Sequence, residues 1–291
     1  MKRINLLTFI IIVVLFFHQY VFAFEWPLKR VVITATFGES RGDHFHNGID
    51  LGGGEQKIFP IADGEVIFEY SDGFYSSLPI GLGNFIVLQH QGDVRSVYCH
   101  LKDGSINPGK KKFSREQSIG LVGDSGHSWG KHLHLSIIDL ETNAFLNPLS
   151  LLPPVEDRQA PIIKNVYIKT GDKLEKIENR MEIKKDTITM VAEIYDLRED
   201  VSFVWKLAPY SITLYRNGVE KYRLVFDSIS KHKGRLTLSN SRVGFDSVYV
   251  GDWKYNLGTI KLLTGENHFL IVARDFKGNE VTRDVFIFLR K

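Results

Sequence analysis

The sequence predicts an all-β protein of two domains, a small antiparallel β domain followed by a β-sandwich. Three observations support this fold class. The chain has 291 residues, a length that suits about two domains. Short apolar segments rich in β-branched and aromatic residues recur along it, separated by glycine-containing turns. The first half contains no long segment with the 3.6-residue periodicity of an amphipathic helix.

Residues 25–152 hold the first group of expected strands. Each is a run of β-branched and aromatic residues that ends at a polar or glycine-containing turn. The expected strands are 31–37, 64–70, 84–90, 94–100 and 132–140. Gln91-Gly92-Asp93 separates the third strand from the fourth, as in a β-hairpin.

The second domain, residues 162–291, follows a stiff linker at residues 153–161. The linker combines prolines with charged residues, which is typical of an extended connection. Beyond it, the expected strands are 188–195, 211–215, 269–274 and 285–289. Asn217-Gly218 is a strong hairpin signal, and short strands separated by turns fit a β-sandwich.

The composition excludes several classes of protein. The chain is 43% hydrophobic and 24% charged, which is ordinary globular material with enough apolar residues for a core. A net charge of +3 is too small to indicate a nucleic-acid partner. The single cysteine, Cys99, excludes an internal disulfide framework and a cysteine-ligated zinc site.

Residues 1–23 are expected to be a signal peptide. Lys2 and Arg3 precede an apolar run that ends at Phe17, and residues 21–23 fit a cleavage signal. The apolar run is short for a bilayer span of about 20 residues, which argues against a retained anchor. We therefore expect an exported protein of the periplasm or cell envelope, with no stable membrane span after cleavage.

Five side chains are candidates for a metal-assisted hydrolytic site: His46, Asp50, His100, His132 and His134. Imidazole and carboxylate suit zinc, and three protein ligands leave a position open for water. His132 and His134 alternate along an expected strand, so they share one face about 6.5–7 Å apart. Two unrelated strand histidines would show the same pattern.

His46 and Asp50 require a bend between them. On an extended strand they would lie roughly 13 Å apart, too far to share one ion. Asn47-Gly48 argues against a helix, so we expect a local bend that Gly48 permits. The alternative is a polar turn in which the carboxylate of Asp50 caps backbone amides.

Strand alternation places His100 on the same face as Tyr98, and it places Cys99 on the other side, in the core. A nucleophilic role for Cys99 is not favoured, because such a thiol needs exposure and a partner base. His44 could form a competing His-x-His pair with His46, and His90 and His127 could line the wall of the site. All three are more simply interpreted as ordinary histidines with no role in the site.

Together these residues resemble the lysostaphin-type, LytM-like zinc endopeptidases, which cleave peptidoglycan peptides. The resemblance runs from about Thr36 to Leu149. The segments that carry it, in matching order and spacing, are 37–38, 46–50, 60–66, 83–90, 98–101, 119–126 and 130–134. The second half is not covered. Its residues 273–279 are similar to bacterial immunoglobulin-like modules, so an immunoglobulin-like sandwich is expected there.

The resemblance implies a role for each candidate residue. His46, Asp50 and His134 would bind one zinc ion per chain, and His100 and His132 would be the catalytic histidines. The small antiparallel β domain at 25–152 would then be a metallopeptidase domain with an open groove.

We accordingly expect a secreted zinc metalloendopeptidase that hydrolyses peptide bonds in peptidoglycan cross-links or stem peptides. The alternative is a non-hydrolytic activator or binding partner of another cell-wall hydrolase. In either case the C-terminal domain is a candidate surface for an envelope protein partner.

Overall fold

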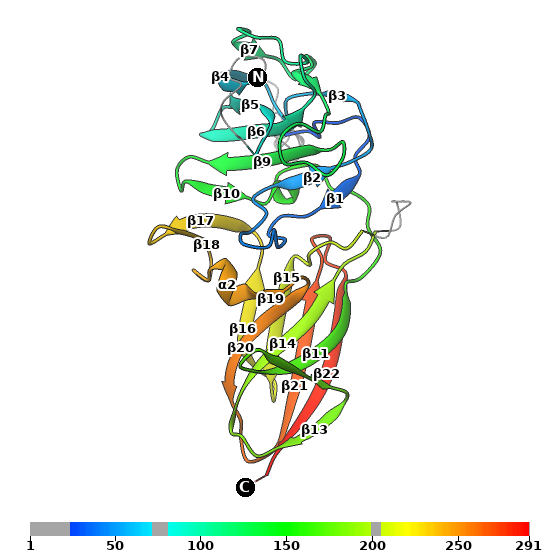
Figure 1. The fold of residues 1–291 in the computed structure, drawn as a ribbon, viewed down its shortest axis with the longest axis vertical. Coiled ribbons are helices and arrows are strands. Elements are labelled where there is room, and N and C mark those ends of the chain that lie inside the picture. Colours follow the sequence, from blue (N-terminus) through cyan, green and yellow to red (C-terminus); the bar gives the residue numbers. More distant parts are fainter. Residues whose placement is uncertain (1–23, 72–80, 199–204, 291) are drawn as a thin grey trace, which may run out of the picture.

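Short strands joined by turns make up nearly all of the structure, so the predicted all-β fold class is confirmed (Figure 1). The computed structural model describes residues 24–71, 81–198 and 205–290. The expected signal peptide at residues 1–23 lies outside the described residues. Within the described part of the chain, no helix combines the length and the apolar character needed to cross a bilayer.

The N-terminal half contains ten strands in the described residues, and a short 3-10 helix at Pro148–Ser150. The strands are β1 (Ile33–Ala35), β2 (Ile49–Leu51), β3 (Lys57–Ile58), β4 (Gly64–Tyr70), β5 (Asn84–Gln89), β6 (Val94–Leu101), β7 (Lys112–Phe113), β8 (Gly120–Leu121), β9 (Leu133–Asp139) and β10 (Ala144–Leu146). All five expected strands of this half are present. The short strands β2, β3, β7, β8 and β10 were not predicted.

Most of these strands belong to one antiparallel sheet. Its order is β18-β17-β10-β9-β6-β5-β4-β7, in which β17 (Ser228–His232) and β18 (Arg235–Leu238) come from the C-terminal half. β2 joins β9 on one side and β1 on the other. One face of the sheet is apolar and buried, as the wholly buried Leu133, Leu135 and Ile137 of β9 show. The opposite face of β9 carries His134, next to β2.

The C-terminal half forms two five-stranded sheets with a single-turn helix, α2 (Phe245–Val248). The first sheet has the order β12-β11-β14-β20-β19 and the second β13-β22-β21-β15-β16. Their strands are β11 (Ile162–Thr170), β12 (Lys173–Ile177), β13 (Arg180–Ile183), β14 (Thr187–Tyr195), β15 (Ser211–Arg216), β16 (Val219–Val225), β19 (Tyr249–Gly251), β20 (Lys254–Lys261), β21 (Gly265–Arg274) and β22 (Glu280–Leu289). Figure 1 shows the two sheets layered against each other, as expected for a sandwich.

The hairpin expected at Asn217-Gly218 is confirmed. β15 and β16 are antiparallel neighbours, and the two turn residues have φ of +50° and +79°. Two consecutive left-handed residues match the right-handed twist of the flanking strands, which explains the preference for Asn-Gly here.

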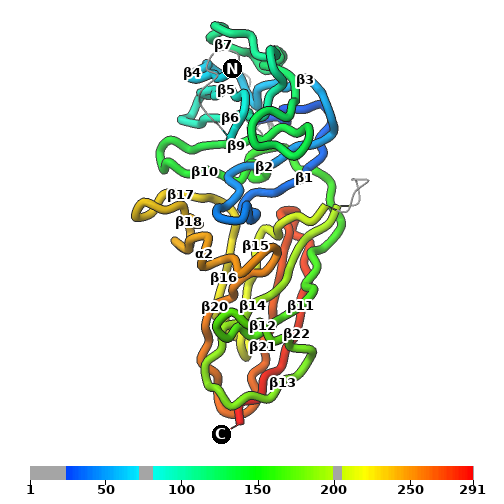
Figure 2. The backbone as a smooth tube through the Cα atoms, in the orientation of Figure 1, coloured from blue at the N-terminus to red at the C-terminus, as the bar shows by residue number. Residues whose placement is uncertain are grey.

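Strand pairing also crosses between the two halves. β17 (Ser228–His232) pairs with β10, with Ser230 opposite Ala144, and β18 (Arg235–Leu238) extends the same sheet (Figure 2). Buried Asn147 strengthens the junction, because its side-chain amide donates to the carbonyl of Phe226 at 2.8 Å. The division at residues 153–161 remains a prediction, but residues 228–238 complete the sheet of the N-terminal half.

Candidate metal centre

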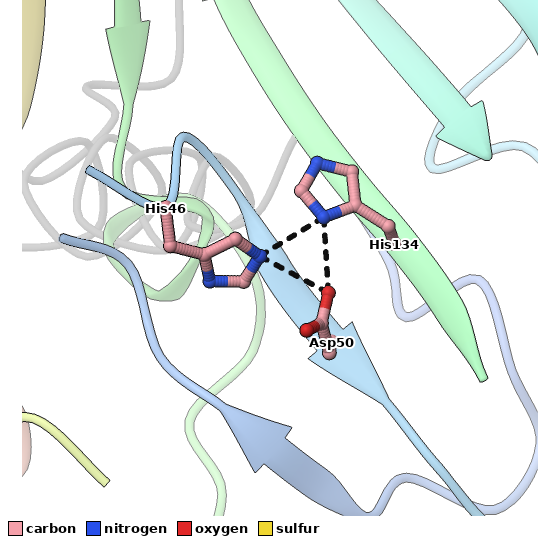
Figure 3. Close-up of side chains that lie close together, drawn as sticks. All are labelled: His46, Asp50 and His134. Atoms are coloured by element: carbon pink, nitrogen blue, oxygen red, sulfur yellow. Dashed lines mark hydrogen bonds and ion pairs between the residues drawn. The ribbon is translucent and has the colours of Figure 1, made fainter. Parts of the chain in front are cut away.

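Three side chains converge from different parts of the N-terminal half (Figure 3). Asp50 on β2 and His134 on β9 are direct cross-strand partners, and His46 lies just before β2. The Oδ1 atom of Asp50 is 3.0 Å from His46 Nε2 and 2.9 Å from His134 Nδ1, and the two nitrogens are 2.9 Å apart. One atom from each residue therefore faces a common point.

The protonation of His46 favours a cation at that point. Its Nδ1 lies 2.8 Å from the carbonyl oxygen of Thr36, which can only accept, so Nδ1 carries the proton. In a neutral ring the Nε2 atom then presents a lone pair towards the carboxylate of Asp50. Two acceptors 3.0 Å apart need a metal ion or a proton between them.

The electrostatic environment keeps the other two residues in the state that binds metal. Burial would raise the pKa of Asp50, but the neighbouring His46 and His134 rings hold it well below its ordinary value. Burial lowers the pKa of His134, which favours a neutral ring. A carboxylate and neutral imidazoles are the ligand forms that a zinc site requires.

A second group of contacts orients His134. Its Nε2 lies 2.9 Å from the hydroxyl of Ser136, and that hydroxyl lies 3.5 Å from Oδ1 of Asn47. If Nε2–H donates to Ser136 and Ser136 donates to Asn47, Nδ1 of His134 is left free as a ligand. Such outer contacts fix the tautomer of a metal-binding histidine.

Gly48 is needed for close approach and not for a special backbone angle. Its φ is outside the left-handed region, so Gly48 permits the expected local bend by its missing side chain and not by a left-handed backbone. A Cβ there would lie 2.3 Å from the carbonyl oxygen of Leu135 and 2.8 Å from Nε2 of His134. The absent side chain lets the segment between His46 and Asp50 approach β9.

Gly48→Ala is expected to lower the free energy of unfolding by about 1–3 kcal/mol, because the new methyl group overpacks the contact with β9. It should also weaken zinc binding, since Asp50 and His134 would move apart. Urea denaturation and chelator competition would measure the two effects. Gly244→Ala is the control, because a Cβ there has no atom within 4 Å and should cost less. Equal effects of the two changes would contradict this account.

His100 comes close to the centre through an unusual backbone conformation. Its φ is +63°, and its ring centroid lies 4.8 Å from that of His132 and 6.2 Å from that of His134. The Nδ1 atom donates to the carbonyl oxygen of Ser125 at 2.8 Å, which leaves Nε2 unprotonated in the neutral ring. Burial lowers the pKa of His100 to about 4, so the ring is neutral at neutral pH.

The left-handed residue breaks the alternation of β6, so the expectation that His100 and Tyr98 share a face was wrong. The hydroxyl of Tyr98 accepts from the backbone N–H of Ile61 at 2.8 Å, within the core. Cys99 pairs directly with His134 and lies on the side of the sheet that carries the centre. It is buried there, and burial together with the charge of Asp50 raises the pKa of its thiol. An inert thiol therefore remains the better interpretation.

His132 is the more accessible of the two histidines predicted to be catalytic. Its Nδ1 atom donates to the carbonyl oxygen of Gly130 at 2.8 Å and lies 3.2 Å from the hydroxyl of Ser128. Its Nε2 atom is 3.9 Å from Oδ1 of Asp50. The structure thus brings His132 and His100 beside the three-residue cluster, each with Nδ1 held by a carbonyl group.

His44, His90 and His127 are not members of the three-residue cluster. His44 is exposed and pairs with Asp43, and His127 is exposed as well. His90 is buried, with hydrogen bonds to the carbonyl oxygen of Asp63 and the hydroxyl of Ser96.

Sequence reasoning missed two charged residues beside the centre. Arg41 donates to Oδ2 of Asp50 at 2.8 Å and to Oε2 of buried Glu39 at 3.1 Å. In the sequence they are part of a mixed-charge stretch before His46, with nothing to distinguish them from surface residues.

Comparison with known proteins identifies relatives of the N-terminal half. Residues 44–148 match the model of peptidase family M23. Residues 160–290 match a second family model, which carries no functional description.

Three curated relatives are each 32% identical to parts of this chain. The murein hydrolase activator NlpD of Escherichia coli (strain K12) aligns over 130 residues, 44% of this chain and 31% of its own length. The peptidoglycan DD-endopeptidase ShyA of Vibrio cholerae aligns over 97 residues, 32% of this chain and 20% of its own. The DD-carboxypeptidase/endopeptidase Mpg of Neisseria meningitidis aligns over 142 residues, 46% of this chain and 30% of its own length. The chain thus spans about a third or less of these relatives.

Two solved structures are similar to parts of this chain. A zinc-containing peptidase from Vibrio cholerae is 28% identical, with a TM-score of 0.33 over 40% of this chain and 36% of that chain. The catalytic domain of lysostaphin from Staphylococcus simulans is 21% identical, with a TM-score of 0.35 over 41% of this chain and 90% of that chain.

Proposed function

Residues 44–148 of this chain belong to peptidase family M23, and on that premise we propose that the protein is a zinc metalloendopeptidase acting on peptidoglycan peptides. The observation that carries the proposal is the convergence of His46, Asp50 and His134 on one point, with His100 and His132 beside it.

We assign His46, Asp50 and His134 as the ligands of one zinc ion per chain. Their donor atoms lie within 4.8 Å of one another, and they are the nitrogen and oxygen donors that zinc accepts. Three protein ligands leave a coordination position open, as in catalytic zinc sites. A bound zinc ion would polarise the scissile carbonyl group and lower the pKa of a water molecule.

We assign His100 as the general base. Its Nδ1–H is held by Ser125, and its neutral state leaves a lone pair on Nε2 to accept a proton from water. Once protonated at Nε2, the same ring would pass the proton to the leaving amine. The fixed Nδ1 contact supports this role because it orients the ring for both transfers.

We assign His132 to stabilisation of the developing oxyanion. Its Nδ1 contact with Gly130 leaves Nε2 directed towards the cluster, 3.9 Å from Oδ1 of Asp50. A protonated Nε2 would donate a hydrogen bond to negative charge that develops on the substrate oxygen.

The curated relatives support peptidoglycan as the substrate class and an exported location. ShyA is named as a peptidoglycan endopeptidase and NlpD as an activator of murein hydrolases. We propose that this chain acts in the periplasm or cell envelope after cleavage of residues 1–23, and that an envelope protein binds to its C-terminal half.

Digestion of purified peptidoglycan sacculi would test the proposal. We expect the purified protein to release peptide-cleaved fragments with zinc present and to stop doing so when a chelator is added. Mass spectrometry of the products would identify the bond. A folded, zinc-loaded sample that releases no fragments would contradict the enzymatic proposal.

The alternative is a non-hydrolytic activator of another wall hydrolase, which the 32% identity to NlpD supports. Adding the protein to sacculi together with a second, weakly active wall hydrolase would distinguish the two functions. An activator would increase the partner's product and yield no cleavage product of its own. An enzyme would yield its own fragments without the partner.

A further inference from the structure

Arg41 binds the oxygen of Asp50 that faces away from the two histidines. Its Nη2 atom is 2.8 Å from Oδ2, whereas Oδ1 lies 2.9 Å from Nδ1 of His134. A charge-assisted hydrogen bond of this length restrains rotation of the carboxylate. It also occupies Oδ2, so that only Oδ1 is available at the centre.

The guanidinium group of Arg41 joins two carboxylates. While Nη2 binds Asp50, Nη1 lies 3.1 Å from Oε2 of Glu39, whose side chain is only 5% exposed. A planar fork can bind two separate carboxylates with fixed geometry, which the single ammonium group of a lysine cannot do. The position of Arg41 is therefore set by Glu39.

Glu39 is held in turn by both halves of the chain. Its Oε1 atom accepts hydrogen bonds from the backbone N–H of Thr36 at 2.7 Å and from that of Ala208 at 3.2 Å. The hydroxyl of Thr36 also lies 2.9 Å from the same oxygen. A buried carboxylate is stable only with such partners, and one of them belongs to the C-terminal half.

The loop that carries these residues lies against the C-terminal half. Tyr249 donates its hydroxyl hydrogen to the carbonyl oxygen of Gly38 at 2.7 Å. A Cβ on Gly38 would lie 2.3 Å from the ring of Phe226. Phe45, next to His46, packs on the rings of Phe245 and Tyr249 at centroid distances of 5.5 and 6.0 Å.

We propose that Arg41 is a positioning residue that keeps Asp50 a ligand through one oxygen only, and that the C-terminal half holds Arg41 in place through buried Glu39. The inference rests on the proposed zinc centre and identifies what maintains its geometry. It gives the C-terminal half a part in the site although that half supplies none of the proposed ligands.

Arg41→Met and Arg41→Lys in the full chain test whether Arg41 positions Asp50. We expect Arg41→Met to weaken zinc binding about 10–100-fold in chelator competition, the range for lost outer contacts at metal sites. Arg41→Lys should not restore the affinity, because one ammonium group cannot bridge both carboxylates. Arg115→Met is the matched control, because it removes an exposed ion pair with Glu25 elsewhere on the same half.

The absorption spectrum of the Co²⁺-substituted protein gives a second readout that general destabilisation would not move. We expect Arg41→Met to change the visible bands, because Oδ2 of Asp50 becomes free to coordinate and the coordination number rises. Arg115→Met should leave the bands unchanged. Circular dichroism on each variant would establish that it is folded.

Glu39→Gln and Tyr249→Phe test the link to the C-terminal half. Glu39→Gln should weaken zinc binding, and the double change with Arg41→Met should bind zinc within about twofold of Arg41→Met alone, since both act through one chain of contacts. Tyr249→Phe should weaken binding by about two- to tenfold, the equivalent of one hydrogen bond. Tyr167→Phe is its control, because that hydroxyl contacts Glu193 within the C-terminal half.

Wild-type zinc affinity and an unchanged Co²⁺ spectrum in folded Arg41→Met would overturn the inference. Tighter zinc binding in that variant would also overturn it, because Arg41 would then compete with the metal for Asp50. Unchanged affinity in both Glu39→Gln and Tyr249→Phe would overturn the link to the C-terminal half. Zinc binding is measured without substrate, so a protein that binds zinc but hydrolyses nothing would contradict only the proposed enzymatic function.

Discussion

His134→Ala is expected to abolish hydrolysis, with a rate loss greater than about 10³-fold, because the metal supplies several kcal/mol of transition-state stabilisation. The change removes one of three converging donor atoms and leaves Asp50 facing a buried gap. Zinc affinity should fall with the rate. Chelator competition and mass spectrometry of digested sacculi would measure the two quantities.

His44→Ala is the matched control for His134→Ala. His44 lies in the same loop as His46, but its ring is exposed and pairs with Asp43. The His44→Ala variant should retain both zinc binding and hydrolysis. Hydrolysis at the wild-type rate by folded His134→Ala would contradict the ligand assignment.

His100→Asn is expected to reduce hydrolysis by about 10²–10⁴-fold, the contribution of one general base, while zinc affinity stays close to that of the wild type. Asparagine tolerates the left-handed conformation that His100 adopts at φ +63°, and its amide can replace the donor to Ser125. The change thus removes Nε2 and little else. Single-turnover rates would measure the loss.

His90→Asn is the control for His100→Asn, because His90 is also buried but lies outside the centre. It should lower stability without a comparable loss of rate. If His100→Asn lost zinc together with activity, His100 would be part of the metal site and not the base.

The pH dependence of stability follows from the same residue, in the metal-free protein. Burial lowers the pKa of His100 to about 4 in the folded state, against about 6.5 for an unfolded chain. Between these values the unfolded state binds more protons, so stability falls as the pH decreases from about 6.5 to about 4. The difference amounts to about 3 kcal/mol. Urea denaturation at several pH values across this range should show that the free energy of unfolding depends less steeply on pH in His100→Asn than in the wild type.

The sequence was informative wherever local pattern decides the structure. A run of β-branched and aromatic residues predicted β4 within its observed bounds, and Asn217-Gly218 predicted a hairpin that is present. The spacing of His132 and His134 indicated two rings near one site, and both lie beside Asp50. These features depend on neighbours in sequence, so one sequence suffices to find them.

Features that depend on distant partners could not be predicted in this way. The left-handed backbone at His100 contradicts simple strand alternation, and the residue types around it do not predict it. The importance of Gly48 arises from Leu135 on another strand. Arg41 acquires its position from buried Glu39, whose partners include Ala208 in the other half.

The shared sheet has a consequence for the order in which the chain folds. β10 can pair with β17 only after the chain has passed through β11 to β16, and the junction joins Asn147 to Phe226 across 79 residues. Contacts of such separation form late, since loop closure must come first. During synthesis the N-terminal half therefore emerges before β10 has its partner strand and before Glu39 has its hydrogen bond from Ala208. A protein built in this way would complete the surroundings of its proposed metal centre late, and a chain cut short before Ser228 would be prone to association through the open edge of β10.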